Sequence, residues 1–269
     1  MLSEYRSSIR RSAISTSPQK HVKTLPIATV LAVSFGTLVI ITVVIVLGIS
    51  LTSGLTNTRD LLIDKASAAM ESAENDLTEL LNPAAYQTQY IAKAISEGQL
   101  DVNNREQLTD YLLAAVAGTP QISTLSFVGP NLQGMASNRD HQRIITFDES
   151  RDPVARLAIR EISSQKKGSW GQLIYVPTLQ ETILSFREPV IRDGQFVGAL
   201  IATITVTTVN NRMNAAQSLT NGKRFILYGN DHVLLQQGMN RPMNGLSVDN
   251  VVPKLEEIED PILKEIWSE

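Results

Sequence analysis

The most regular feature of the chain is an unbroken apolar run near its start. From Leu25 to Leu51 the sequence LPIATVLAVSFGTLVIITVVIVLGISL contains no charged residue. About 20 apolar residues, at about 1.5 Å each in an α-helix, cross a hydrocarbon core of about 30 Å. A buried helix of a soluble domain would carry a polar stripe, and a cleaved signal peptide has an apolar core of only about 7–15 residues. The pattern therefore predicts a transmembrane helix over residues 25–52.

Small and apolar residues then recur at steps of three or four over residues 53–97, which predicts one long stalk helix. Asn82–Pro83 predicts a kink or a break in it, because proline lacks the N–H of a helical hydrogen bond. The recurring face packs on the helix's own domain, or the helix also pairs with a second copy of the chain as it leaves the membrane, and its alanines favour close approach of helices. We expect a homodimer through this stalk helix. The positions of the face are Leu62, Ala66, Ala69, Ala73, Leu77, Leu80, Ala84, Ile91 and Ile95.

Beyond the stalk, a second helix is predicted over Arg105–Ala117, and the period then changes to the alternation of half-buried strands. The run ISTLSFVG places Leu125 and Phe127 on one face and Ser126 on the other, and LQGMASN is the expected returning strand. Asp152–Pro153 begins a short amphipathic helix that ends near residue 162, because both residue types favour a helix start.

The strongest strand pattern lies between residues 168 and 206. A strand with Trp170 and Tyr175 precedes ETILSFREPVI and QFVGALIATITV, which are joined by a turn at Asp193–Gly194. Asp–Gly between two β-rich runs is a strong hairpin signal. Helices and antiparallel strands in this order predict an α+β fold rather than alternating βαβ units. We assign residues 98–206 to one membrane-distal lobe.

Residues 207–269 begin with another helix and a second hairpin that turns at Gly229–Asn230–Asp231. They end in the acidic segment VPKLEEIEDPILKEIWSE, without a second apolar span. About sixty residues are too few to complete a second sheet lobe. We therefore expect the start of a membrane-proximal lobe that is cut short.

The distribution of charge predicts how the chain is oriented across the membrane. Residues 1–24 form a basic tail with a net charge of +4, so the rest of the chain sums to −7 within the total of −3. Basic residues gather on the cytoplasmic side of a membrane span, which places the N-terminus in the cytoplasm and residues from about 53 onward outside, in the periplasm of a bacterium if the span lies in an inner membrane. The acidic outer part argues against a nucleic-acid partner.

The composition also limits the chemistry. The chain has no cysteine and only three histidines, His21, His141 and His232, and no two of them lie at metal-ligand spacing. It has no G-x-S-x-G elbow and no phosphate loop. We therefore predict that this chain is not an enzyme and that it uses no cofactor and no metal.

The quoted residues resemble the double Cache sensor domains of bacterial membrane receptors over residues 57–269. The main similarity is W-G-x-L-x-Y followed by ILSFREPVIRDGQFVGALIATITV, which looks like the end of the family's outer lobe. TPQISTLSFVGPNLQG, RFILYGNDHVLL and EIEDPILKEIW are similar to the sensor half of membrane-bound class III adenylate or guanylate cyclases. That resemblance implies a catalytic domain beyond residue 269. Sensors of histidine kinases, chemoreceptors or diguanylate cyclases are the alternatives, together with a non-signalling tether and, less favoured, an extracytoplasmic enzyme.

In the family the ligand lies between the sheet and the loops and short helices that cover it. The resemblance places Trp170 and Tyr175 on a strand that walls this pocket, although both could equally be core aromatics. If the apolar face of the strand 181–191 packs on the long helix, Arg187 points into the pocket, where its planar fork can pair with a carboxylate. The alternative is a surface arginine paired with Glu188 or with solvent.

Ser126 and Thr203 complete the predicted ligand-binding set. Amino-acid-binding members of the family carry an aspartate at the position that aligns with Thr203, where it holds an ammonium group. A threonine cannot neutralise that charge, so we expect an anionic or uncharged small molecule. The loop with Arg139, Asp140, His141 and Arg143 either caps the pocket or is a solvated loop.

Overall fold

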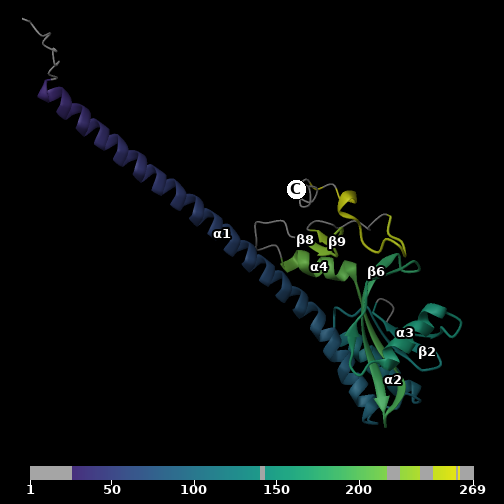
Figure 1. Ribbon diagram of the computed structural model, residues 1–269. Helices are drawn as coiled ribbons and strands as arrows, with labels where there is room; N and C mark the ends of the chain where they lie inside the picture. Colours follow the sequence, from purple (N-terminus) through teal and green to yellow (C-terminus); the bar gives the residue numbers. More distant parts are fainter. Residues whose placement is uncertain (1–25, 140–142, 217–224, 237–244, 259, 261–269) are drawn as a thin grey trace, which may run out of the picture. The chain divides into compact units, whose positions relative to one another are not determined.

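The computed structural model describes residues 26–139, 143–216, 225–236, 245–258 and 260. The chain divides into two units, residues 1–66 and Ser67–Glu269. Helix α1 (Ile27–Ser96) contributes to both units (Figure 1).

In the first unit, α1 is long and apolar enough to cross a membrane, with a window of mean hydropathy 2.9 and no buried residue in that window. Three hydroxyl groups in its apolar part are satisfied within the helix. The hydroxyls of Ser34, Thr37 and Thr42 donate to the carbonyls four residues earlier, at 2.8, 2.7 and 2.9 Å. Such internal hydrogen bonds suit an apolar surrounding, where no water can take the place of a partner.

Of the kink or break predicted at Pro83, the break does not occur, because the helix continues through the proline to Ser96. On either side of the proline, Leu80 and Ala84 are buried in the second unit. Packing of this kind compensates for the one hydrogen bond that a proline removes. Arg192 also satisfies the helix end, since its guanidinium donates to the carbonyls of Ile95 and Leu100.

The second unit is an α+β lobe built on one antiparallel sheet, as the sequence predicts. The strand order is β3-β2-β1-β7-β6-β4, and β5 also pairs with β6. The strands are β1 (Thr124–Val128), β2 (Gln133–Asn138), β3 (Arg143–Asp148), β4 (Ser169–Trp170), β5 (Ile174–Val176), β6 (Glu181–Arg192) and β7 (Gln195–Thr205). The β6–β7 turn at Asp193–Gly194 has φ of 52° and 76°, the left-handed pair that a tight hairpin turn requires.

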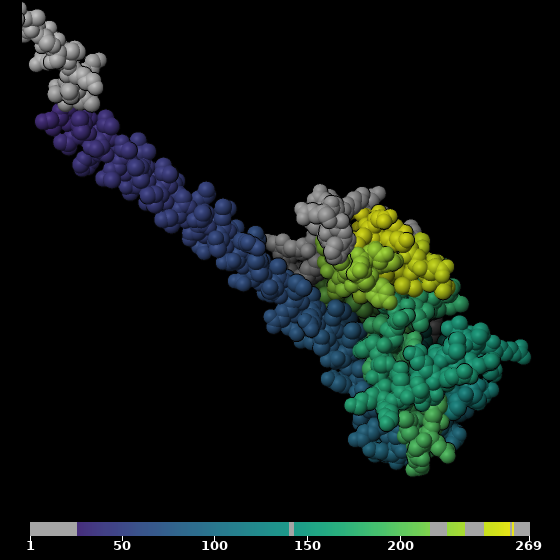
Figure 2. Space-filling view, viewed as in Figure 1, coloured from purple at the N-terminus to yellow at the C-terminus, as the bar shows by residue number. Residues whose placement is uncertain are grey.

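The C-terminal part of this unit contains α4 (Val206–Ala216), the hairpin β8 (Phe225–Tyr228) and β9 (His232–Gln236), and a short 3₁₀ helix η2 (Leu255–Glu257). The hairpin forms where the sequence predicts it. The segment after it packs back on the lobe, because Val252 is buried with Leu173 and Leu184, and the Thr182 hydroxyl donates to the Val251 carbonyl. In Figure 2 the described residues after the hairpin, drawn in yellow, lie against the green residues that precede them in the sequence.

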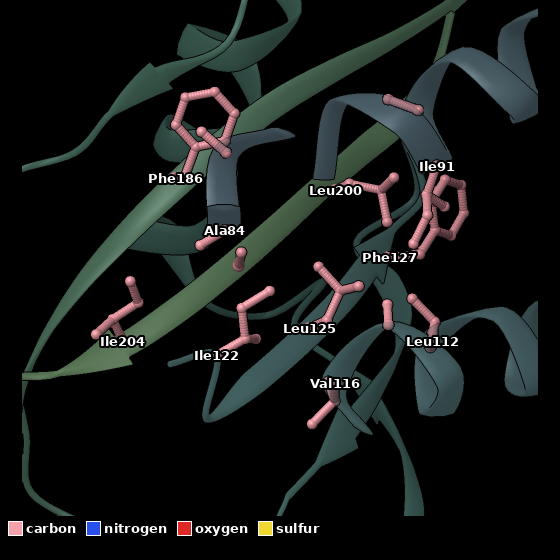
Figure 3. Packing of buried hydrophobic residues seen from close by; sticks show 14 of the residues in the cluster. Ala84, Ile91, Leu112, Val116, Ile122, Leu125, Phe127, Phe186, Leu200 and Ile204 are labelled. Carbon is pink, nitrogen blue, oxygen red and sulfur yellow. The ribbon is translucent and has the colours of Figure 1, made fainter. Parts of the chain in front are cut away.

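One face of the main sheet packs on α1 and on α2 (Arg105–Gly118). Ala84 and Ile91 of α1 and Leu112 of α2 point toward Leu125 and Leu200 of the sheet (Figure 3). All five are buried. The recurring face of the stalk helix is therefore used inside the chain's own lobe from about Leu77 onward, which is the first of the two alternatives drawn from the sequence.

Helix α3 (Pro153–Ser164) covers part of the opposite face. It starts where the sequence predicts, with the Asp152 carboxylate accepting from the Val154 N–H at 2.8 Å. Ile159 and Ile162 are its buried residues, and they pack with Ala199 of β7. The strand residues beyond this contact are only half-buried.

Candidate functional site

Strand β6 presents two chemically different faces. Successive side chains of a strand point to opposite sides, so Leu184 and Phe186 share one face while Ser185 and Arg187 share the other. Phe186 is buried in the core that contains α1. The apolar face of β6 thus packs on the long helix, as the sequence-based prediction for Arg187 required. Arg187 lies on the opposite face, the side on which α3 packs.

The register of the sheet brings three of the predicted residues together on this side. Ile201 of β7 is paired with Ser126 on one side and with Arg187 on the other. In the next row, Thr203 is paired with Ser185. We call the group Ser126, Ser185, Arg187 and Thr203 the Arg187 face. Ser185 is 5% exposed and the other three are half-buried.

The guanidinium of Arg187 is held in place by its neighbours. Its Nε donates to the Ser185 hydroxyl at 3.3 Å. The group lies against the backbone of Gly171, where a Cβ would come within 2.8 Å of the guanidinium carbon. No carboxylate of the described residues lies within salt-bridge distance of Arg187. Glu188 cannot be its partner, because it points to the other side of the sheet. The two Nη nitrogens of Arg187 are thus the part of its guanidinium that can bind a negatively charged group on this face.

The two aromatic residues of the predicted set do not lie on the Arg187 face. Trp170 is paired with Phe186, and the two rings meet edge to face with centroids 5.3 Å apart. Tyr175 is paired with Thr182, which shares the Phe186 side. Trp170 lines a groove of about 630 Å³ between α1 and β8 instead. Its packing agrees with the alternative that it is a core aromatic.

A larger hollow, of about 890 Å³, lies beside the start of α2 and the β1–β2 turn. It is lined by none of the predicted site residues. Its polar groups are mostly engaged with one another, since Asn131 donates to Gln133 at 3.2 Å and Gln133 donates to Asp148 at 3.2 Å. Hydrogen bonds from the Ser150 hydroxyl and backbone lower the pKa of Asp148. The positive side chain of this lining, Arg105, is exposed, whereas Arg187 is half-buried and held by its neighbours.

The residues of the basic loop after β2 have different outcomes. Arg139 has a structural role, because its guanidinium donates to the carbonyls of Ile122, at 3.0 Å, and Thr119, at 2.7 Å, beyond the end of α2. Asp140 and His141 lie outside the described residues. Within the described residues, no group of three or more His, Asp or Glu side chains could hold a metal ion.

The Arg187 face contains one residue that was not predicted from the sequence. Ser185 fixes Arg187 and lies directly beside Thr203, but it was not among the predicted ligand-binding residues. The signal was present, because the alternation that assigns Arg187 to one face assigns Ser185 to the same face.

Comparison of the sequence with protein-family models and with curated proteins finds no match. Solved structures do match. The sensory domain of the Campylobacter jejuni chemoreceptor Tlp3 (CcmL) is similar with a TM-score of 0.52 at 13% identity, over 62% of this chain and 68% of that one. The ligand-binding domain of the same receptor in complex with L-valine gives 0.53 at 11% identity, over 66% and 71%.

A structure described as methyl-accepting chemotaxis protein X gives a TM-score of 0.50 at 14% identity, over 66% of this chain and 75% of that chain. At such low identity the likeness concerns the fold. The chain therefore has the fold of chemoreceptor sensory domains, which agrees with the Cache-type architecture that the sequence resembles. These matches give no link to an adenylate or guanylate cyclase.

Proposed function

We propose that this chain is the extracytoplasmic input region of a membrane receptor and that it binds a small molecule on the Arg187 face. The observation that carries the proposal is the Arg187 guanidinium, which Ser185 and Gly171 hold against the sheet and which no described carboxylate neutralises. A positioned, half-buried cation beside hydroxyl groups is suited to one end of a polar ligand. The fold shared with chemoreceptor sensory domains supports the same assignment.

The ligand class follows from the charges of the face. Arg187 favours a carboxylate, while Ser126, Ser185 and Thr203 contribute hydroxyl groups and no negative charge. An α-amino acid also needs a partner for its ammonium group, and this face contains no carboxylate for it. We infer that the ligand is a carboxylate without an α-amino group.

The membrane assignment rests on the apolar part of α1. Residues 25–52 would span a bacterial inner membrane, with the basic residues 1–24 in the cytoplasm and the ligand-binding lobe in the periplasm. The helix length and its internally satisfied hydroxyls support this arrangement.

For the output, the structural matches favour a chemoreceptor over the cyclase suggested by the sequence, because the similar structures named above are chemoreceptor sensory domains. The output partner itself would lie outside residues 1–269.

A homodimer through the stalk helix remains part of the proposal, but its contact face changes. From Leu77 onward the alanine-rich face is occupied by the chain's own lobe. Tyr86 and Tyr90 lie one helical turn apart on the outer side of α1 and are 65% and 64% exposed. A second copy would pack on this tyrosine side.

The test is a thermal-shift screen of the full chain in detergent, with one panel of carboxylates without an amino group and a second panel of amino acids. A ligand at a hundredfold excess over its Kd stabilises the folded state by about 2.7 kcal/mol. For a lobe of about 200 residues this corresponds to a rise in Tm of roughly 5–11 °C. The proposal expects such a rise with a carboxylate.

Two variants test the location of the site. Arg187→Ala should abolish the ligand-induced rise while the unliganded Tm changes little, because the side chain is only half-buried. Arg105→Ala, in the larger hollow, is the matched control and should retain the full rise. A rise that Arg187→Ala leaves intact would place the ligand elsewhere, and a response to amino acids alone would overturn the inferred ligand class.

A further inference from the structure

Strand β3 forms one edge of the main sheet. It pairs with β2 without a bulge, and among the described residues no strand pairs with its outer side. Sheet edges in natural proteins are usually protected by lysine, proline or a bulge, because their unpaired N–H and C=O groups otherwise pair with another strand. From Ile144 to Phe147 this strand contains no charged residue, proline or glycine, and Ile145 is 49% exposed. The edge therefore lacks the usual protection against pairing.

The hydrogen bonds of the sheet show which backbone groups of β3 face outward. The Glu149 N–H donates to the Leu132 carbonyl at 3.0 Å, and these two residues lie directly opposite in the register of the β2–β3 pair. Hydrogen-bonding direction alternates along an antiparallel strand, so the odd-numbered residues of β3 bond to β2. The residues that present their N–H and C=O groups to the outside are therefore Ile144, Thr146 and Asp148.

We propose that this edge pairs with β3 of a second copy of the chain, antiparallel and about a two-fold axis at Thr146. In an antiparallel pair, residues whose backbone groups face the partner lie opposite one another. With Thr146 on the axis, the two copies of Thr146 face each other, and Ile144 of each copy faces Asp148 of the other. Every outward backbone group of the strand then has a partner, and threonine opposite threonine is a favourable cross-strand pair.

The same register also matches the side chains. Successive side chains of a strand alternate, so Arg143, Ile145, Phe147 and Glu149 lie on one face of β3. In the paired strands, Arg143 lies opposite Glu149 of the second copy. Ile145 lies opposite Phe147, and the two-fold axis repeats both pairs. These are the positions without hydrogen bonds between the copies, where opposite side chains come closest. Arg143 and Glu149 are both exposed, so each is accessible to a second copy.

Neighbouring registers that preserve the hydrogen-bond pattern match less well. An axis at Ile145 would place Arg143 opposite Phe147 and remove the charge pair. An axis at Phe147 would place Arg143 opposite Arg151, and like charges directly opposite are destabilising. Charge complementarity therefore selects the axis at Thr146 and favours a second copy over an unrelated extended peptide. The interface goes beyond the proposed receptor function, and its residues are separate from the tyrosine side of α1.

A single introduced thiol reports contact between copies, because the chain has no cysteine. Thr146→Cys places two sulfur atoms at the axis, where the Cα atoms of a hydrogen-bonded pair are about 5.5 Å apart. The purified full chain in detergent is treated with a short bis-maleimide, and the cross-linked dimer is measured by gel electrophoresis. Leu179→Cys, 52% exposed in the turn between β5 and β6, is the matched control for random collision. Thr146→Cys should give a several-fold higher yield than this control.

Charge reversal then tests the register. Arg143→Glu in the Thr146→Cys chain places like charges opposite one another on both sides of the axis and should lower the yield several-fold. Adding Glu149→Arg should restore it, because opposite charges face each other again. Both residues are exposed, so thermal unfolding of each variant should match that of the parent. Equal yields from Thr146→Cys and Leu179→Cys, or a yield that charge reversal leaves unchanged, would overturn the proposal. No ligand is used, so a negative result here leaves the proposed ligand-binding function intact.

Discussion

The attachment of α1 to the sheet can be tested at Ile91, which is 1% exposed and belongs to the core shared by α1, α2 and the sheet. Ile91→Ala removes three carbon atoms. Their transfer from water contributes about 2.4 kcal/mol at about 0.8 kcal/mol each, and the cavity left behind adds to the loss. We expect a decrease of about 3–4 kcal/mol in the free energy of unfolding. Alanine is the better helix former, so helix propensity cannot account for a loss.

The assay is thermal unfolding of the full chain in detergent, followed by circular dichroism. At about 2–4 °C per kcal/mol for a lobe of this size, Tm should fall by roughly 6–16 °C. Lys93→Ala, two residues further along the same helix, is the control and should stay within about 0.5 kcal/mol, because Lys93 is exposed and its ion pair with Glu97 lies at the surface. If both variants melted at the same temperature, α1 would not be part of the lobe's core.

Four further predictions address the site and the fold. Thr203→Asp should remove the carboxylate-induced rise in Tm and introduce a response to amino acids, and a retained carboxylate response would argue against Thr203 as a site residue. Because burial raises the pKa of Glu188 above its ordinary 4.5, the folded state binds more protons, so the stability due to this group is present below pH 4.5 and is lost as pH rises through the folded pKa. Glu188→Gln should therefore gain stability over the wild type between pH 4 and pH 7 in urea unfolding, and parallel pH profiles would contradict this. Gly134→Ala should lower the urea midpoint by the equivalent of about 1–3 kcal/mol, because its Cβ would lie 2.6 Å from the Phe127 carbonyl oxygen; an unchanged midpoint would show that the β1–β2 pair can separate. Since the chain has no cysteine, Tyr90→Cys should form a cross-linked dimer on oxidation in nanodiscs, whereas cysteine at the buried Ile95 should not.

Local sequence patterns predicted most of the lobe. The alternation in residues 181–206, with Asp193–Gly194 between its halves, predicted β6, β7 and their turn, because a two-residue loop with positive φ needs such residues. Asp152 and Pro153 predicted the start of α3 for an equally local reason. Strand β3 escaped notice, since it lies at the sheet edge and its residues are mostly exposed, so they need no apolar alternation.

Long-range pairing decided the candidate site. Ser126 and Arg187 lie 61 positions apart in the sequence, and they share a face because β7 pairs with both of their strands in one register. A register shifted by one residue would send Ser126 to the opposite side. No local pattern specifies that register, which depends on how Leu125 and Leu200 fit beneath α1 and α2. The sequence likewise did not predict on which face of the sheet Trp170 lies. Its pairing with Phe186 places it on the face that packs on α1.

The sequence by itself therefore determined the apolar helix, the order of helices and strands, and the separation of Arg187 from the apolar side of its own strand. These properties depend on residues within a few positions of one another, through helix and strand periodicity. Only the tertiary structure decided which hydroxyls accompany Arg187 and that Trp170 and Tyr175 lie on the other side of the sheet. Those contacts join segments far apart in the chain, and they exist because burying a shared core fixes the strands in one register.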